Sequence, residues 1–270
     1  MSAPTATTIA SLDDSRVAPY RHIGDTSYLS EHRLFVAEGR RVVARLLSAP
    51  SWQVQSVLVT PTALDSLATV FAQTASRAPV YVVDQTDMNA IVGFNIHRGC
   101  LALAARPADR TLAENGTTGV SRVVMLEGVN NPDNVGGIFR SAAAFGADLV
   151  VLGPDCGDPF YRKAIRTSMA ATLHVPFVLA SQWPAAIGLM RDSGFTVIAL
   201  TPSAAANPLS KVSLLSRRLA LLVGAEGDGL TPEAISAASL TARIPMSAQV
   251  DSLNVATAAS IAMYHLFGEQ

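Results

Sequence analysis

Polar residues crowd the stretch LEGVNNPDNVGGIFRSAAAFGAD, residues 126 to 148, directly after an apolar run. The side chains of Asn131 and Asn134 can turn the chain and cap a helix that would run to about Phe145. A helix start with free N–H groups suits an anion. The stretch therefore indicates anion binding, and phosphate is one such anion.

Gly136, Arg140 and Ala144 recur at every fourth position of this helix and would share one face of it. The two small residues would let another backbone or a phosphodiester approach closely, and the guanidinium group would reach the same spot. The alternative is that the glycines serve only helix packing and that Arg140 is an ordinary surface residue.

A second segment, VGAEGDGLTPE at 223 to 233, has three glycines within six residues after an apolar run. Gly224, Gly227 and Gly229 could let the backbone approach a flat ligand such as a purine, with Glu226 beside it. The spacing is not G-x-G-x-x-G and does not follow a first strand, so a dinucleotide site has little support. A glycine-rich turn without a ligand is the alternative.

A third segment, RIPMSAQVDSLNVATAASIAMYHLF at 243 to 267, begins with an apolar triplet that proline interrupts. The triplet predicts a short edge strand or none. Ser252 or Asn254 can cap the long helix that follows, and simple capping is the alternative to a binding role.

These segments lie in a repeating pattern of strands and helices. The pattern predicts an α/β fold with a parallel sheet that is covered on both faces. Ligands bind such sheets beyond the carboxyl ends of the strands, where the first two segments would lie. The predicted strands are 123–126, 149–152, 175–179, 195–200 and 219–223.

A smaller α/β domain precedes them at 26–105. It contains a predicted helix at 35–49 and predicted strands at 54–60, 79–84 and 100–107. We expect a flexible N-terminus over 1–25, and the polar residues 106–121 predict a linker. Residues 122–270 would then form the larger domain.

Composition excludes several classes of protein. The chain has 270 residues, 49% of them apolar, and a net charge of −1, so any nucleic-acid contact would use a local basic patch. No apolar run approaches the roughly 18 residues of a membrane span, and the N-terminus does not read as a signal peptide. Two distant cysteines and five scattered histidines predict neither a disulfide nor a metal site, and we expect a cytoplasmic protein.

Together the three segments resemble the three motifs of the SpoU/TrmH family of RNA ribose 2′-O-methyltransferases, within the SPOUT superfamily. The matching residues are NNPDNVGGIFR, VGAEGDGL, and IPM followed by SLNVATAAS, and they occur in the family's order. KAIRTSMAATLHVPF (163–177) also resembles a family segment, with Ala170 where many relatives have glycine. FVAEG (35–39) and HRGCLALAARP (97–107) resemble the family's ribosomal-protein-like, RNA-binding domain.

The resemblance implies a deep trefoil knot in the larger domain and a homodimer with the final helix in its interface. It also implies S-adenosylmethionine as the cofactor, with no metal. Gly224, Ile244 and Leu253 would contact the cofactor through their backbone. Thr201 and Met246 would border the same slot.

Arg140 matches the family's essential arginine, which has been proposed as a general base in relatives. Because guanidinium stays protonated in almost any protein site, holding a phosphate and stabilising the developing oxyanion is the simpler role. Asn134, Glu226, Ser252 and Asn254 match the family's other polar positions and would orient the arginine and the ribose.

RNA would be held by phosphate contacts. The candidates are Arg162, Lys163 and Arg166, with Arg40 and Arg41 on the N-terminal helix; solvated charged faces are the alternative. The expected function is 2′-O-methylation of ribosomal RNA. Transfer RNA methylation, a non-catalytic RNA-binding protein and a nucleotide-dependent oxidoreductase are the competing hypotheses, and the sequence does not give the nucleotide modified or the purpose.

Overall fold

The computed structural model describes residues 6–212, 217–247 and 249–268. The chain divides into two compact units: Met1–Pro107 with Phe160–Ala170, and Ala108–Pro159 with Ala171–Gln270. Residues 160–170, which the sequence assigns to the larger domain, therefore pack with the first unit.

The first unit contains a mixed five-stranded sheet in the order β1-β4-β3-β5-β2. Strands β1, β4 and β3 are parallel to one another, and β5 runs antiparallel to β3 and β2. Its strands are β1 Ala6–Thr8, β2 Leu34–Glu38, β3 Val54–Val59, β4 Val80–Val82 and β5 Cys100–Ala105. Its helices are η1 Ala18–His22, α1 Thr26–Glu31, α2 Arg40–Ser48, α3 Pro61–Ser66, α4 Ala68–Gln73, α5 Gln85–Val92 and α8 Arg162–Thr167.

Strand β2 occupies the first part of the region predicted as a helix over 35–49. All five of its residues are buried, and they pair with β5. Gly39, with φ of 95°, then turns the chain into α2. The prediction was wrong before residue 40 because a short apolar run of this length fits a buried strand as well as a helix.

The first residues of the chain also differ from the expectation of flexibility over 1–25. Strand β1 pairs with β4, and Val17, Tyr20 and Ile23 are buried in the core of the first unit. The Tyr20 hydroxyl lies 2.8 Å from Ser56 Oγ, a buried hydrogen bond. Residues 6–25 are thus packed against the sheet, while 1–5 lie outside the described residues.

The second unit contains a seven-stranded sheet in the order β10-β12-β9-β11-β6-β7-β8, in which every paired neighbour is parallel. The predicted parallel α/β sheet is confirmed. Its strands are β6 Arg122–Glu127, β7 Leu149–Leu152, β8 Phe177–Leu179, β9 Thr196–Leu200, β10 Asn207–Pro208, β11 Leu219–Gly224 and β12 Leu240–Arg243. The sequence pattern missed β10 and β12, which are short and only partly buried.

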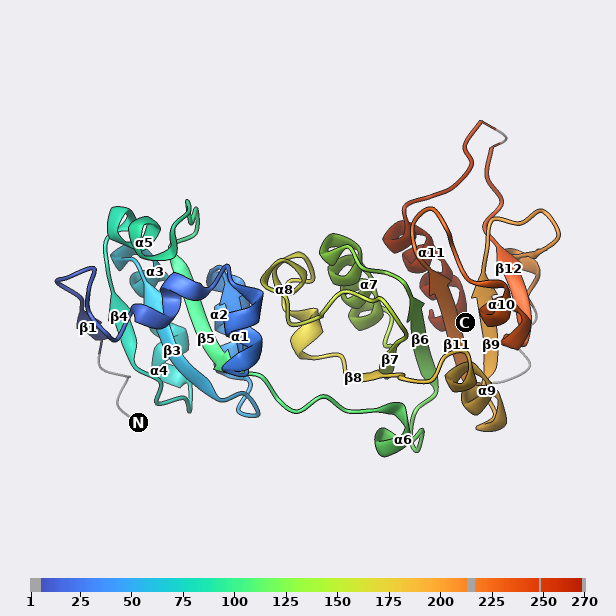
Figure 1. Cartoon of the computed structure of the whole chain (residues 1–270), viewed down its shortest axis with the longest axis horizontal. Coiled ribbons are helices and arrows are strands. Elements are labelled where there is room, and N and C mark those ends of the chain that lie inside the picture. The colour runs from blue at the N-terminus through green and yellow to red at the C-terminus, as the bar shows by residue number, and fades with distance from the viewer. Residues whose placement is uncertain (1–5, 213–216, 248, 269–270) are drawn as a thin grey trace. The chain divides into compact units, whose positions relative to one another are not determined.

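Helices cover this sheet on both faces. Side chains that alternate along the strands, such as Val123 and Met125, pack with α9 and α10, and the intervening ones face the other side. On that other side α7 and α11 lie against each other, and α11 also packs on β11 (Figure 1). The helices are α6 Leu112–Asn115, α7 Pro132–Ala144, η2 Ala171–Leu173, α9 Ala185–Asp192, η3 Leu209–Lys211, α10 Pro232–Ala237 and α11 Val255–Phe267.

Part of the predicted linker is ordered in the second unit. Thr111 and Glu114 form a capping box at the start of α6, and Leu112 is buried in the core under the sheet. Thr111 also pairs with Leu179 at the end of β8. The predicted linker therefore includes a short helix that is packed against the second unit.

Ala170, the residue that stands where many relatives have glycine, has φ of +69° and is fully buried. Only glycine adopts this left-handed conformation without a steric cost. The backbone conformation at this position therefore favours glycine, and this chain tolerates alanine there.

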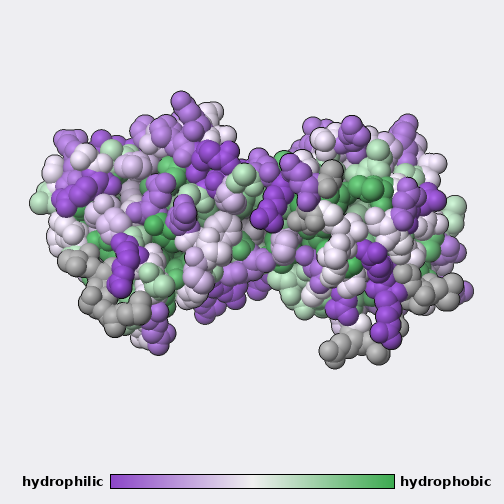
Figure 2. Space-filling view, turned by 90° about the horizontal axis from the view of Figure 1, so that it is seen from below, coloured by the Kyte–Doolittle hydropathy of each residue, from purple (hydrophilic) through white to green (hydrophobic). Residues whose placement is uncertain are grey.

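Within the described residues neither a membrane-spanning helix nor a disulfide is present. On the face drawn in Figure 2 hydrophilic residues predominate over both units. None of the helices among the described residues has the length and apolar character to cross a membrane. Both thiols are free: burial raises the pKa of Cys100 to about 12, and the Cys156 thiol donates to the Leu126 carbonyl.

Candidate active site at the carboxyl ends of β9 and β11

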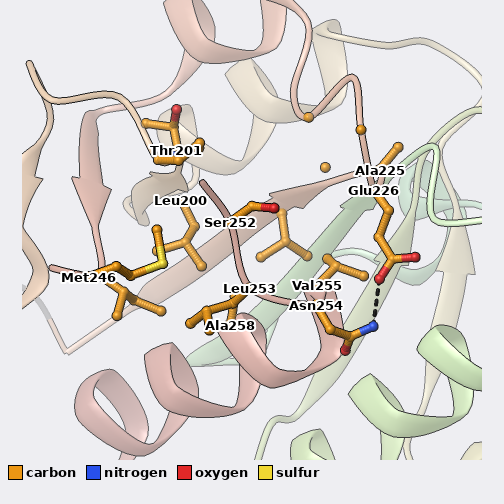
Figure 3. Close-up of a pocket in the computed structure, with 16 residues that line it drawn as sticks. Leu200, Thr201, Ala225, Glu226, Met246, Ser252, Leu253, Asn254, Val255 and Ala258 are labelled. Atoms are coloured by element: carbon orange, nitrogen blue, oxygen red, sulfur yellow. Dashed lines mark hydrogen bonds between the residues drawn. The ribbon is translucent and has the colours of Figure 1, made fainter. Parts of the chain in front are cut away.

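A cavity of about 430 Å³ opens in the second unit where β9 and β11 end (Figure 3). Its size lies in the range of small-molecule sites, roughly 300–1,000 Å³. It collects residues from the end of β9, the turn after β11, the segment after β12 and the start of α11. The lining residues are Leu200, Thr201, Pro202, Val223, Gly224, Ala225, Glu226, Gly227, Gly229, Ile244, Met246, Ser252, Leu253, Asn254, Val255 and Ala258.

Gly224 lines the cavity, and the turn after β11 can pack directly on it because it has no side chain. A Cβ added there would lie 2.3 Å from the backbone carbon of Gly229 and 2.5 Å from the Leu230 nitrogen. The turn after β11 thus folds back onto the last residue of the strand, with Gly229 at φ of +72°. The close approach of the protein's own backbone accounts for Gly224, and the positive φ angles of Gly227 and Gly229, +91° and +72°, account for the other two glycines.

Apolar side chains line the opposite part of the cavity. Ile244, Met246 and Leu253 are half-buried; the first two belong to the proline-interrupted triplet, and Leu253 precedes α11. Thr201 lies beside them, with its backbone N–H donated to the Ala242 carbonyl at 2.9 Å. All five residues expected to contact the cofactor therefore line one cavity.

A polar cluster joins all three motifs at the edge of the cavity. The Asn254 amide donates to Asn134 Oδ1 at 2.9 Å and to Glu226 Oε1 at 2.5 Å (Figure 3 draws the second bond). Asn254 Oδ1 accepts from the backbone N–H groups of Ala256 and Thr257, so it also caps α11. Capping and the cluster are thus both functions of Asn254, and Ser252 lines the cavity as an exposed residue.

Arg140 lies apart from this cluster. It is exposed on α7 and is not among the residues that line the cavity. Its side chain makes no hydrogen bond or ion pair with any other residue that the structure describes. The guanidinium group is therefore available to a ligand outside the cavity.

Gly137 of α7 lies at a close contact with α11. A Cβ at Gly137 would lie 2.9 Å from the Cβ of Ala256 in α11, and Ser141 Oγ lies 2.6 Å from Ser260 Oγ across the same contact. Gly137 therefore serves helix packing rather than ligand binding, because the residue that approaches it closely is Ala256 of α11.

The residues expected to bind RNA lie in the first unit and differ in availability. Arg162 and Arg166 both pair with the buried Glu38, at 2.7 and 3.2 Å, and Arg162 also lies over the Phe94 ring. Lys163 is half-buried and has a partner of its own. These three are engaged within the protein, whereas Arg40 and Arg41 line a second cavity.

Glu127 is a residue that the sequence analysis did not single out. Its buried carboxylate accepts from Trp183 Nε1 at 2.8 Å and from the Thr231 backbone N–H and hydroxyl at 3.0 and 2.8 Å. Thr231 caps α10 directly after the glycine-rich turn. Glu127 thus fixes the end of the turn that forms the cavity. In the sequence, the sign of this role was an acidic residue at the end of an apolar strand.

Comparison with known proteins decides the family. Residues 121–264 match the SpoU rRNA Methylase family, which is more than half of the chain. The chain belongs to the SpoU family. This membership confirms the resemblance that the three motifs predict.

Two SpoU-family relatives align over almost the whole chain. An uncharacterised tRNA/rRNA methyltransferase of Mycobacterium tuberculosis is 39% identical over 258 residues, covering 93% of this chain and 88% of the relative. The 23S rRNA (guanosine(2553)-2′-O)-methyltransferase RlmP of Bacillus subtilis is 25% identical, covering 96% and 99%. The fold matches that of the AdoMet-bound rRNA methyltransferase of Sinorhizobium meliloti, with a TM-score of 0.79, 24% identity and 97% coverage of both chains.

Among the described residues, no group of three or more His, Cys, Asp or Glu side chains is arranged to hold a metal ion.

Proposed function

We propose that this SpoU-family enzyme transfers a methyl group from S-adenosylmethionine to a ribose 2′-hydroxyl of structured RNA, with ribosomal RNA as the substrate. The observation that carries the proposal is the cavity that the second and third motifs line, with Asn134 of the first motif hydrogen-bonded to Asn254 at its edge. Full-length similarity to a 23S rRNA 2′-O-methyltransferase supports ribosomal RNA as the target.

The cavity suits S-adenosylmethionine. Ile244, Met246 and Leu253 offer an apolar slot for the adenine, and the turn that packs directly on Gly224 forms a wall of the cavity. Glu226 and Asn254 add polar groups at the edge. The cofactor supplies the methyl group, and the backbone at Gly224, Ile244 and Leu253 would hold it.

The remaining polar residues would position the RNA. Methyl transfer to a hydroxyl requires an aligned oxygen, a route for its proton and an environment that favours the developing alkoxide. Asn134 and Glu226 hold the Asn254 amide in place, and Ser252 with the second carboxylate oxygen of Glu226 would orient the ribose. Arg140, which has no described partner, would hold the adjacent phosphate and stabilise the oxyanion.

The test is methyl transfer to purified RNA. We expect tritium from labelled S-adenosylmethionine to enter ribosomal RNA, and nucleoside mass spectrometry to find 2′-O-methylribose. Methylation of transfer RNA alone would correct the target. If no RNA is labelled although calorimetry shows S-adenosylmethionine binding, the protein is a non-catalytic RNA binder, and binding of NAD in its place would indicate an oxidoreductase.

We further propose that the second unit forms a trefoil knot and that the enzyme is a cytoplasmic homodimer. Ile261 and Tyr264 of α11 are exposed, the latter at 70%, and apolar exposure on the final helix supports an interface there. Light scattering is expected to give twice the chain mass of 28.3 kDa. Replacing Ile261 and Tyr264 with glutamate should yield monomers, and a wild-type monomer would contradict the dimer.

A further inference from the structure

Glu127 lies at the end of β6, where it is the register partner of Gly224 at the end of β11. Its carboxylate accepts three hydrogen bonds, one from Trp183 Nε1 and two from the hydroxyl and the backbone N–H of Thr231. We propose that Glu127 is a positioning residue for the cofactor: it holds the turn after β11 in the shape that binds S-adenosylmethionine, and it links this turn to Trp183. The inference rests on the proposed function for its cofactor.

The carboxylate of Glu127 depends on these three donors. The residue is only 5% exposed, and it forms no ion pair with any residue that the structure describes. A buried carboxylate is costly unless hydrogen bonds replace those that it loses to water. Trp183 Nε1 and the Thr231 hydroxyl both donate to Oε1 at 2.8 Å, and the Thr231 N–H donates to Oε2 at 3.0 Å. Hydrogen bonds to an ionised acceptor are the strong ones, so both partners are held firmly.

The turn after β11 is held at one end by the strand and at the other by Glu127. Thr231 closes the turn and is the N-cap of α10. Within the turn the Gly229 N–H donates to the Ala225 carbonyl at 3.2 Å, so its two arms are joined. Gly229 and Glu226 both line the cavity, so a shift of Thr231 would displace part of the cavity wall.

Trp183 connects the same carboxylate to the end of β7. A Cβ added at Gly153, directly after β7, would lie 3.0 Å from Trp183 Cε3, so the indole packs on the backbone there. The indole is partly buried against the core of the second unit. Because Trp183 Nε1 and the Thr231 hydroxyl share one oxygen of Glu127, a change in the turn alters the surroundings of the indole. Trp183 fluorescence should therefore report cofactor binding.

The test replaces Glu127 with glutamine in the full-length protein. Glutamine keeps the size of the side chain but puts an NH₂ donor in place of one acceptor oxygen, so at least one of the three bonds is lost. By calorimetry we expect Glu127→Gln to bind S-adenosylmethionine about ten-fold more weakly than wild type. At saturating cofactor the bound state of the turn is restored, so kcat for RNA methylation should stay within about three-fold of wild type while KM for the cofactor rises.

Asp148→Asn is the matched control for a lost carboxylate. Asp148 also accepts three hydrogen bonds, from the Ser121 N–H and hydroxyl at 2.8 and 3.0 Å and from the Arg122 N–H at 2.8 Å. These donors lie at the opposite end of β6, away from the cavity. At a temperature where both variants are folded, Asp148→Asn should change S-adenosylmethionine affinity less than about two-fold. An equal loss in both variants would overturn the proposal, since the effect would then be one of general stability.

Two substitutions of Thr231 test whether Glu127 acts through it. Thr231→Val removes the hydroxyl and should weaken S-adenosylmethionine binding about five-fold, whereas Thr231→Ser keeps it and should bind within about two-fold of wild type. Residues that act as one unit give non-additive effects, so Glu127→Gln combined with Thr231→Val should lose less than the product of the single losses. Fully additive losses would overturn the route through Thr231.

Fluorescence tests the link to Trp183. The chain has two tryptophans, and Trp52→Phe leaves Trp183 as the one that remains. In this background we expect saturating S-adenosylmethionine to change the emission of Trp183, and Glu127→Gln to reduce that change. Unchanged emission with cofactor bound would overturn the link.

The outcomes for wild type and Glu127→Gln separate this inference from the proposed function. If both bind S-adenosylmethionine with equal affinity, the positioning role is refuted and the proposed function stands. If wild type binds no S-adenosylmethionine, the proposed function fails and the inference fails with it.

Discussion

Arg140→Ala is expected to lower the rate of RNA methylation by about 10² to 10³-fold while S-adenosylmethionine binding stays at the wild-type level. The two effects separate because Arg140 is exposed on α7 and does not line the cavity at β9 and β11. With no described partner, its guanidinium group supports no part of the fold. Its loss should therefore remove a contact to the RNA and leave the cofactor site intact.

Single-turnover rates at saturating RNA, together with calorimetry for S-adenosylmethionine, measure this separation. Arg140→Lys keeps a positive charge without the planar fork and should recover a part of the lost rate if the arginine acts as an anchor. Arg110→Ala is a matched control, since it removes another exposed arginine of the same unit whose side chain has no described partner, and it should leave the rate unchanged. Wild-type turnover by Arg140→Ala would refute the proposed role.

The meeting of the first two motifs followed from the sequence through one structural rule. Parallel strands place their carboxyl ends on one edge, so residues after β6 and β11 meet there although they lie far apart in the chain. The residue types indicated what individual positions could do. Asn254 suits both a helix cap and a hydrogen-bonded cluster, and Gly224 allows a close backbone approach. Periodicity and turn chemistry thus indicated the edge of the sheet at which a ligand would bind, and the family resemblance supplied the residues expected around the cofactor.

Pairwise contacts between distant residues were not available from the sequence. Nothing in the local pattern says that Glu38 pairs with Arg162 and Arg166, which the sequence groups with Lys163 as one basic run. The same limit hid the contact of Glu127 with Thr231, 104 residues later. Local patterns describe faces and ends of elements, whereas the availability of a charge depends on which partner the fold brings to it.

Gly224→Ala is expected to lower S-adenosylmethionine affinity by at least 100-fold and to destabilise the second unit. The added Cβ would lie 2.3 to 2.5 Å from backbone atoms of Gly229 and Leu230, which cannot move aside as a side chain can. The turn after β11 must shift instead, and that turn forms a wall of the cavity. Overpacking of this kind costs about 1–3 kcal/mol, which corresponds to a melting temperature lower by roughly 2–12 °C.

Gly188→Ala is the control for this substitution because Gly188 lies in α9 of the same unit and an added Cβ would meet no atom within 4 Å. Alanine in a helix interior should raise stability by about 0.5–1 kcal/mol, through the smaller loss of backbone entropy on folding. Calorimetric titration and thermal melting of both variants separate the effects. A Cβ 2.3 Å from the backbone carbon of Gly229 forces the turn to move, so a cofactor held against that turn must bind more weakly. If Gly224→Ala bound S-adenosylmethionine with wild-type affinity and melted at the wild-type temperature, the turn after β11 would not be the wall of the cofactor site.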